Sequence, residues 1–237
     1  MTTPASAARP PPGLIIREFR SPAAAAEALA AAVADDLSQA IRQRGTATLA
    51  VSGGTTPAGF LRDRGTRPLQ WPLVRVTLTD ERWVPAGSPR ANATLVAGTL
   101  LAGAARDCRW QPLYCDGLAR PAGLARLNDR LAAFGWPLDV AVLGMGEDGH
   151  VASLFPGAAS WDSPDTHIRV IAANAPTGEE RVSLTLATLR AARHRYLLLH
   201  GVRKAAVLQQ PAALPVGALT KDAFPPVFAF VSLEDSP

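Results

Sequence analysis

The strongest constraint on the fold is a short apolar run that leads directly into a glycine-rich loop. Residues 138–143 read LDVAVL, and the loop that follows, residues 144–150, reads GMGEDGH. A run this short with almost continuous apolar side chains is typical of a strand covered on both faces, as in a parallel sheet packed between helices. The apolar run and the glycine-rich loop together predict an inner strand of an α/β sheet, with a sharply folded loop at its carboxyl end.

The rest of the chain alternates between strand-like and helical patterns. Ser21 and Pro22 form the start signal of an alanine-rich helix that Gly45 ends. The alternation implies right-handed βαβ crossovers, so we expect an α/β fold of the Rossmann-like type: a doubly wound, mostly parallel sheet with helices on both faces. We expect one domain over residues 14–237, after a flexible, proline- and alanine-rich tail over residues 1–13. The pattern predicts strands over 14–16, 46–51, 74–79, 138–143, 168–172, 196–200 and 227–233, and helices over 23–44, 58–63, 91–101, 122–134 and 202–209.

Composition excludes several classes of protein. Apolar stretches are interrupted well before the roughly 20 residues that a membrane span needs. The 24 basic and 20 acidic residues are evenly mixed, which argues against a nucleic-acid partner. Cys108 and Cys115 fit neither a disulfide framework nor a CxxC motif, and no metal-ligand spacing is present. These features predict a cytoplasmic protein without metal, nucleic acid or membrane contact, and the lack of a patterned interface helix favours a monomer.

Two further loops follow predicted strands and are expected to share the carboxyl edge of the sheet, where open α/β sheets bind ligands. Residues 52–57 read SGGTTP. Paired glycines and hydroxyls at a helix start are suited to an anion, although the same pattern serves in an ordinary strand-to-helix turn. Residues 80–83 read DERW, which indicates either charged groups at the mouth of a cleft or a solvated corner.

The loop over residues 144–150 carries the residues best suited to chemistry. Its three glycines allow a sharp turn that presents Asp148 and His150 to the same cleft. Histidine transfers protons near neutral pH, and a nearby carboxylate can fix its tautomer. Two cations could complete an anion site, Arg181 and Lys204; the latter is one of only two lysines among 24 basic residues. A solvated helix lysine is the alternative interpretation.

Read in order, these segments resemble the 6-phosphogluconolactonase family. The matching stretches are VSGGTTP, LTDERWVP, LGMGEDGHVASLFPG, RVSLTL and GVRKAAVLQ, and the resemblance extends from residue 15 to the last strand. Its most specific part covers residues 144–156. The resemblance implies hydrolysis of 6-phosphoglucono-δ-lactone to 6-phosphogluconate in the pentose phosphate pathway, without metal or cofactor. It also implies a fold like that of glucosamine-6-phosphate deaminase.

The resemblance assigns catalytic roles to four residues. His150 matches the general base that activates water, and Asp148 would orient its imidazole. Arg82 is expected to contact the substrate or the developing oxyanion, while Asp80 occupies the position where the deaminase relatives keep a proton-transferring acid.

The resemblance also implies a set of substrate-binding residues. Asn92 lies where the family commonly has Ser-Asn, although Ala91 replaces the serine here. The phosphate loop would consist of Ser52, Gly53, Gly54 and Thr55, with Arg181 and Lys204 as its cationic clamp.

Two alternatives remain at the level of sequence. A glucosamine-6-phosphate deaminase/isomerase would have a Phe-Asn-Glu-Pro stretch after Asp-Gly-His and a tyrosine in place of Arg82. Here residues 151–156 read VASLFP and supply no carboxylate. A non-catalytic sugar-phosphate sensor would lack the acid–base pair or carry an appended DNA-binding segment, and the sequence shows neither.

Overall fold

A computed structural model describes residues 12–54, 69–159, 161–163, 165, 167–211 and 213–234 of the chain. Its main feature is a seven-stranded sheet in which all neighbouring strands are parallel. In sheet order the strands are β1 (Leu14–Phe19), β10 (Val227–Ser232), β9 (His194–His200), β6 (Val140–Leu143), β2 (Ala47–Val51), β3 (Val74–Leu78) and β5 (Arg109–Gln111).

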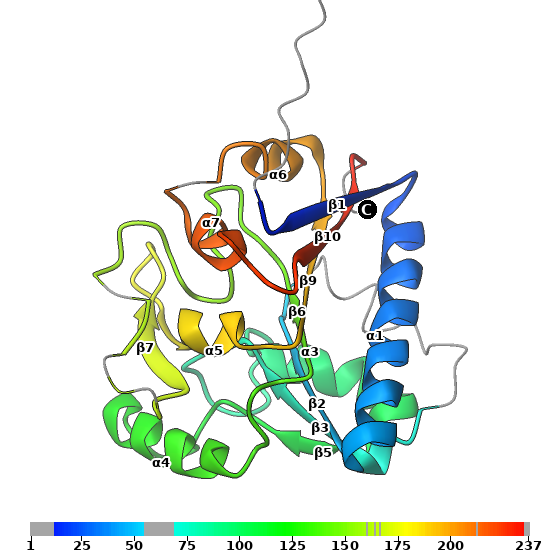
Figure 1. The fold of residues 1–237 in the computed structure, drawn as a ribbon. Coiled ribbons are helices and arrows are strands. Elements are labelled where there is room, and N and C mark those ends of the chain that lie inside the picture. Colours follow the sequence, from blue (N-terminus) through cyan, green and yellow to red (C-terminus); the bar gives the residue numbers. More distant parts are fainter. Residues whose placement is uncertain are drawn as a thin grey trace, which may run out of the picture.

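Helices cover both faces of this sheet, which confirms the predicted fold class. Figure 1 shows α1 along one side of the central strands, and α5 and α7 on the other. Every residue of β2 and β6 is buried, as expected for strands that lie between two layers of helices. The helices are α1 (Pro22–Arg44), α3 (Asn92–Gly98), α4 (Arg120–Ala132), α5 (Leu186–Arg190), α6 (Val202–Val207) and α7 (Pro215–Thr220).

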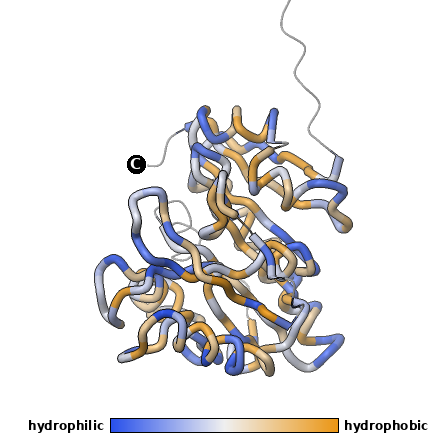
Figure 2. Tube along the Cα trace, turned by 90° about the vertical axis from the view of Figure 1, so that its left-hand side faces the viewer, coloured by the Kyte–Doolittle hydropathy of each residue, from blue (hydrophilic) through white to orange (hydrophobic). Residues whose placement is uncertain are grey.

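Helix α1 begins and ends where its sequence signals indicate. The Ser21 hydroxyl accepts a hydrogen bond from the backbone N–H of Ala24 at 3.2 Å, and Gly45 ends the helix with φ +75°. The buried face of the helix includes Leu29 and Leu37, and it packs on β2, β6, β9 and β10. Along the trace, hydrophobic segments run through the interior and hydrophilic ones gather in outer turns (Figure 2).

A second, antiparallel sheet was not predicted. It consists of β4 (Asp80–Arg82), β8 (Glu180–Leu184) and β7 (Val170–Asn174). The prediction of a loop at residues 80–83 was wrong, because β4 pairs with β8 through its backbone although its side chains are all charged. The strand expected at 168–172 exists as β7 but belongs to this sheet. Short elements without apolar periodicity, namely β5, α5 and α7, were also missed, and the helix expected at 58–63 lies outside the described residues.

The strand order creates a crevice between β2 and β6. From β2 the chain proceeds to β3 and β5, which lie on one side of β2 within the sheet. It then returns to β6, which is the neighbour of β2 on the other side. The loops that leave these two neighbouring strands therefore run in opposite directions, which is where ligands bind in open α/β sheets. Within the described residues, no helix has the length and apolar character needed to cross a membrane.

Candidate active site

A cleft of about 230 Å³ lies at the carboxyl ends of β2 and β6, at this reversal of strand order. It collects side chains from both sheets and from α6. Its described lining comprises Ser52, Gly53, Gly54, Asp80, Arg82, Asn92, Gly144, Met145, Gly146, His150, Ala152, Arg181 and Lys204.

The two loops that form the floor of the cleft are joined directly. The Ser52 side chain is buried, and its Oγ accepts a hydrogen bond from the backbone N–H of Gly144 at 2.9 Å. The backbone N–H of Ser52 donates to the Val142 carbonyl at 3.0 Å. Ser52 therefore fixes the two loops relative to each other as well as facing the cleft.

The loop after β6 brings an imidazole and a carboxylate together. Nδ1 of His150 lies 2.6 Å from Oδ1 of Asp148, and the His150 ring packs against Phe155 with centroids 4.8 Å apart. A Cβ at Gly146 would overlap atoms of both His150 and Asp148, so a side chain there would displace this pair. The His150 side chain is 30% exposed, which leaves the ring held by its neighbours yet accessible from the cleft.

A second cluster joins β4 to α3. Asn92 is buried, and its Oδ1 accepts a hydrogen bond from Nη1 of Arg82 at 2.7 Å while its Nδ2 donates to the Asp80 carbonyl at 2.9 Å. Oδ2 of Asp80 accepts a hydrogen bond from the Ser153 hydroxyl at 2.5 Å. Gly53 lies so close to Asn92 that any side chain there would overlap the amide. The first loop, β4 and α3 are thus in direct contact.

The side chain of Glu81 lies behind this cluster and does not line the cleft. It is 1% exposed, and its carboxylate accepts hydrogen bonds from the backbone N–H groups of Arg82, Asn92 and Ala93 at 2.7, 2.7 and 2.8 Å. Burial raises the pKa of Glu81, and these three N–H donors oppose that rise.

The cations of the cleft differ in how they are compensated. Nε and Nη2 of Arg181 donate to Oε2 of Glu179 at 3.0 and 2.7 Å, and Nη1 lies 3.8 Å from Oδ2 of Asp80. Burial alone would raise the pKa of Glu179, but its hydrogen bond from Arg90 and the charge of Arg181 hold that pKa below its ordinary value. Lys204, in the last turn of α6, forms no ion pair with any described residue. Of Arg181 and Lys204, it is therefore the less compensated cation.

Most of the residues predicted from the sequence come together in this cleft. Nine of them line it, and Asp148 contacts it through His150. Thr55 lies outside the described residues. Sequence reasoning missed the carboxylates of Glu81 and Glu179 and the Ser153 hydroxyl. Glu81 and Ser153 act through contacts with other segments of the chain. Glu179 lies only two residues before Arg181, and that spacing was a signal that could have found it. The only sequence signal for the close approach of Gly146 to His150 and Asp148 was the spacing of glycines in the loop.

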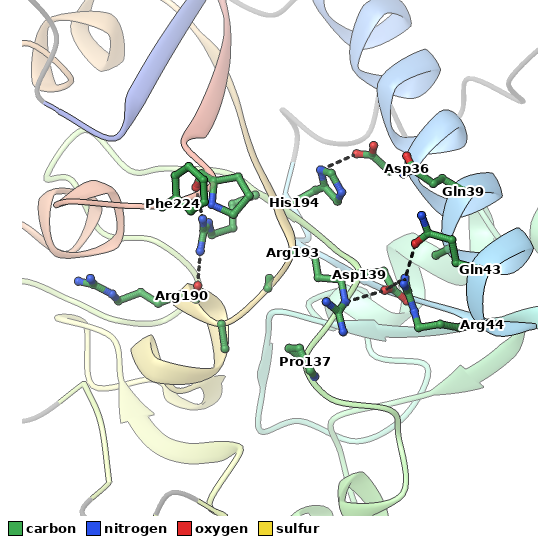
Figure 3. Close-up of a pocket in the computed structure, with 15 residues that line it drawn as sticks. Asp36, Gln39, Gln43, Arg44, Pro137, Asp139, Arg190, Arg193, His194 and Phe224 are labelled. Atoms are coloured by element: carbon green, nitrogen blue, oxygen red, sulfur yellow. Dashed lines mark hydrogen bonds and ion pairs between the residues drawn. The ribbon is translucent and has the colours of Figure 1, made fainter.

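A second pocket, of about 460 Å³, lies at the opposite edge of the sheet, where β6 and β9 begin (Figure 3). Its cations are engaged with the protein itself: Arg44 and Arg193 both contact the carboxylate of Asp139, at 2.5 and 3.4 Å. His194 lies 3.3 Å from Asp36. This pocket contains none of the predicted site residues. No group of His, Cys, Asp and Glu in the described part of the chain is arranged to hold a metal ion.

Fold and cleft together define a class of α/β protein that binds a small polar ligand at the strand reversal and places a histidine–carboxylate pair beside it. The family model for glucosamine-6-phosphate isomerases and 6-phosphogluconolactonases matches residues 20–227. The chain belongs to this family.

Relatives of this chain are named 6-phosphogluconolactonases. A 6-phosphogluconolactonase of Rhizobium meliloti is 43% identical over 219 residues, which cover 88% of this chain and 94% of the relative. A 6-phosphogluconolactonase of Mesorhizobium japonicum is 49% identical over 69% of this chain and 71% of the relative. The crystal structure of a 6-phosphogluconolactonase from Shewanella baltica superposes with a TM-score of 0.86 at 32% identity, covering 92% of this chain and 97% of that one. The family resemblance predicted from the motifs is confirmed.

Proposed function

We propose that this chain hydrolyses 6-phosphoglucono-δ-lactone to 6-phosphogluconate, with His150 as the general base. The observation that carries the proposal is the contact of 2.6 Å between Nδ1 of His150 and Asp148, at a cleft that also contains Lys204. The names of the relatives support the same reaction.

The contact with Asp148 determines what His150 can do. A proton on Nδ1 satisfies the carboxylate and leaves the lone pair on Nε2 for the reaction. Nε2 takes a proton from water while the water oxygen attacks the lactone carbonyl carbon. The bond from that carbon to the ring oxygen then breaks, and the imidazolium returns its proton to the ring oxygen. The products are a free hydroxyl and a carboxylic acid, which loses its proton to solvent. No covalent intermediate and no cofactor are required.

Two further groups act on the charge of the substrate. Arg82 is positioned by Asn92 to stabilise the oxyanion that forms on the carbonyl oxygen. Lys204, the backbone of residues 52–54 and Arg181 bind the phosphate, and this remote binding orients the ring for attack. A positioned base contributes about 10²–10⁴-fold, and an oriented oxyanion donor contributes roughly another 10²–10³-fold.

One assay tests this function against its alternatives. Acid release from fresh 6-phosphogluconolactone is followed with and without the protein, and ammonia release from glucosamine-6-phosphate is measured in parallel. We expect accelerated acid release and no ammonia. Ammonia release would identify a deaminase, and binding of 6-phosphogluconate without turnover of either substrate would identify a sensor.

The segment after His150 supports the lactonase over the deaminase. Residues 151–156 read VASLFP and contain no carboxylate to assist ring opening. In the structure, Ser153 donates a hydrogen bond to Asp80 and Phe155 packs against the imidazole. The proposal also includes a cytoplasmic location, a monomeric state, and a single catalytic domain over residues 14–237. Residues 1–11 of the tail expected before this domain lie outside the described residues.

A further inference from the structure

Helix α3 begins without a cap of its own. Its N-cap residue is Ala91, whose methyl group cannot accept a hydrogen bond. The first N–H groups of a helix need acceptors, and Ser, Thr, Asp or Asn normally supply one from the N-cap position. At α3 the acceptor is the carboxylate of Glu81, eleven residues before Asn92. A negative charge at this end of a helix is also favoured by the helix dipole.

The same carboxylate connects α3 to the strand that carries the cleft residues. Side chains alternate along a strand, so Asp80 and Arg82 face the cleft while Glu81 points to the other side of β4. From there Glu81 binds the N–H of Arg82 in its own strand and the N–H of Asn92 at the start of α3. One buried group therefore sets the position of both residues.

We propose that Glu81 is a positioning residue for the reaction, which acts through Asn92 on the guanidinium of Arg82. This inference rests on the proposed function. Asn92 accepts a hydrogen bond from Arg82 and donates to the Asp80 carbonyl, and it packs directly on Gly53. A shift of α3 relative to β4 displaces the Asn92 amide and, with it, the Arg82 guanidinium. Lys204 comes from a different element, so its contribution to phosphate binding is retained, and only the contact of Asn92 with Gly53 links the shift to the phosphate end of the cleft.

The test compares Glu81→Gln with Glu180→Gln, which makes the same chemical change at a half-exposed carboxylate on β8. We expect Glu81→Gln to lower kcat by roughly 10- to 100-fold with a change in KM below about threefold, and Glu180→Gln to change neither. An unaltered kcat in Glu81→Gln overturns the proposal, and so does an effect confined to KM.

A rescue experiment separates positioning from a direct effect of charge. Adding Ala91→Ser to Glu81→Gln supplies a hydroxyl at the N-cap without restoring the carboxylate. We expect the double variant to recover a substantial part of kcat. If α3 regains its cap while kcat stays low, the charge of Glu81 acts directly and the positioning role is refuted.

Amide hydrogen exchange measures the contacts of Glu81 with α3 independently of activity. In Glu81→Gln we expect the amides of Asn92 and Ala93 to exchange roughly tenfold faster. Ala91→Ser should slow the exchange of Ala93, which is at the N2 position that an N-cap hydroxyl reaches. Unchanged exchange overturns the proposal. If Glu81→Gln fails to fold, Glu81→Asp, which keeps the charge and withdraws it by one methylene, is measured in the same way. Absence of lactone hydrolysis by the unaltered protein contradicts the proposed function, whereas the exchange rates decide the contacts of Glu81 in either case.

Discussion

Charged side chains serve different purposes at the two edges of the main sheet. At the amino edge, Asp139 accepts hydrogen bonds from the N–H and hydroxyl of Thr48 and from Arg44, and it pairs with Arg193 (Figure 3). At the carboxyl edge, Lys204 and the imidazole of His150 face a cleft, and Lys204 has no carboxylate partner within the described residues.

The difference separates charges that stabilise the fold from charges that are available to a ligand. The amino-edge pocket, of about 460 Å³, is larger than the cleft, of about 230 Å³, so size alone does not identify the binding site. The buried carboxylate of Asp139 and its two partly exposed arginines are already paired with each other, so they have little left to offer a ligand. The cleft retains uncompensated groups, which is the property expected of a binding site. Substitutions at the two edges should therefore have separable effects.

The largest effect is expected at His150. Replacing it by Asn removes the base and should lower kcat by about 10²–10⁴-fold, while the midpoint of urea unfolding stays close to that of the unaltered protein. Steady-state turnover of fresh lactone and a denaturation curve measure the two quantities. Retained turnover in His150→Asn would eliminate the imidazole as the base.

The amino edge should show the reverse pattern. Asp139→Ala leaves the buried Thr48 N–H without its acceptor, while the two arginines remain partly exposed to water. We therefore expect the free energy of unfolding to fall by about 1–3 kcal/mol with kcat unchanged. Asp139→Asn, which retains one acceptor oxygen, should cost less. If Asp139→Ala lowered kcat without loss of stability, the separation between the two edges would be broken.

The two cations assigned to the phosphate, Arg181 and Lys204, provide a sharper comparison. Lys204→Met should raise KM by roughly tenfold through loss of an uncompensated charge near the phosphate. Arg181→Met should raise KM less, because Glu179 and Asp80 already offset the guanidinium charge. Initial-rate measurements over a range of lactone concentrations give both values. A larger rise in KM for Arg181→Met would reverse the assignment of the main phosphate contact.

The smallest effect is a dependence of stability on pH. Burial lowers the pKa of His200 below its ordinary value of 6.5, and the charge of Lys204 lowers it further. The unfolded chain therefore binds a proton at a higher pH than the folded chain, so the free energy of unfolding should decrease as pH falls from about 6.5 toward the lowered pKa. Urea unfolding between pH 7 and pH 5 measures this slope, and His200→Gln should reduce it. An unchanged slope in His200→Gln would assign the effect to other groups.

The sequence predicted the elements with strong local signals and missed those without them. Residues 138–143 were identified through apolar continuity, and α1 through its cap, proline and closing glycine. By contrast, β4 consists of three charged residues, and only its pairing with β8 makes it a strand. The short helices α5 and α7 likewise depend on packing, since their lengths are below that at which isolated helices form.

The candidate site divides in the same way. Asp148 and His150 are two residues apart, so one loop and its glycines were enough to predict that they lie near each other. The contact between Nδ1 and Oδ1 was identified in the structure. Glu81 was visible only as one of three charges in a row. Its role as the cap of α3 depends on the distance between two elements that no local pattern encodes.

The sequence by itself determined the parallel α/β sheet, the family and the loop that carries Asp148 and His150, because these depend on hydrophobic periodicity and on residues close together in the chain. Only the tertiary structure decided which charges are compensated, that β4 belongs to a second sheet, and that a carboxylate in β4 caps a distant helix. Charge compensation and helix capping depend on distances between atoms that folding brings together. Those distances cannot be obtained from the order of residues along the chain.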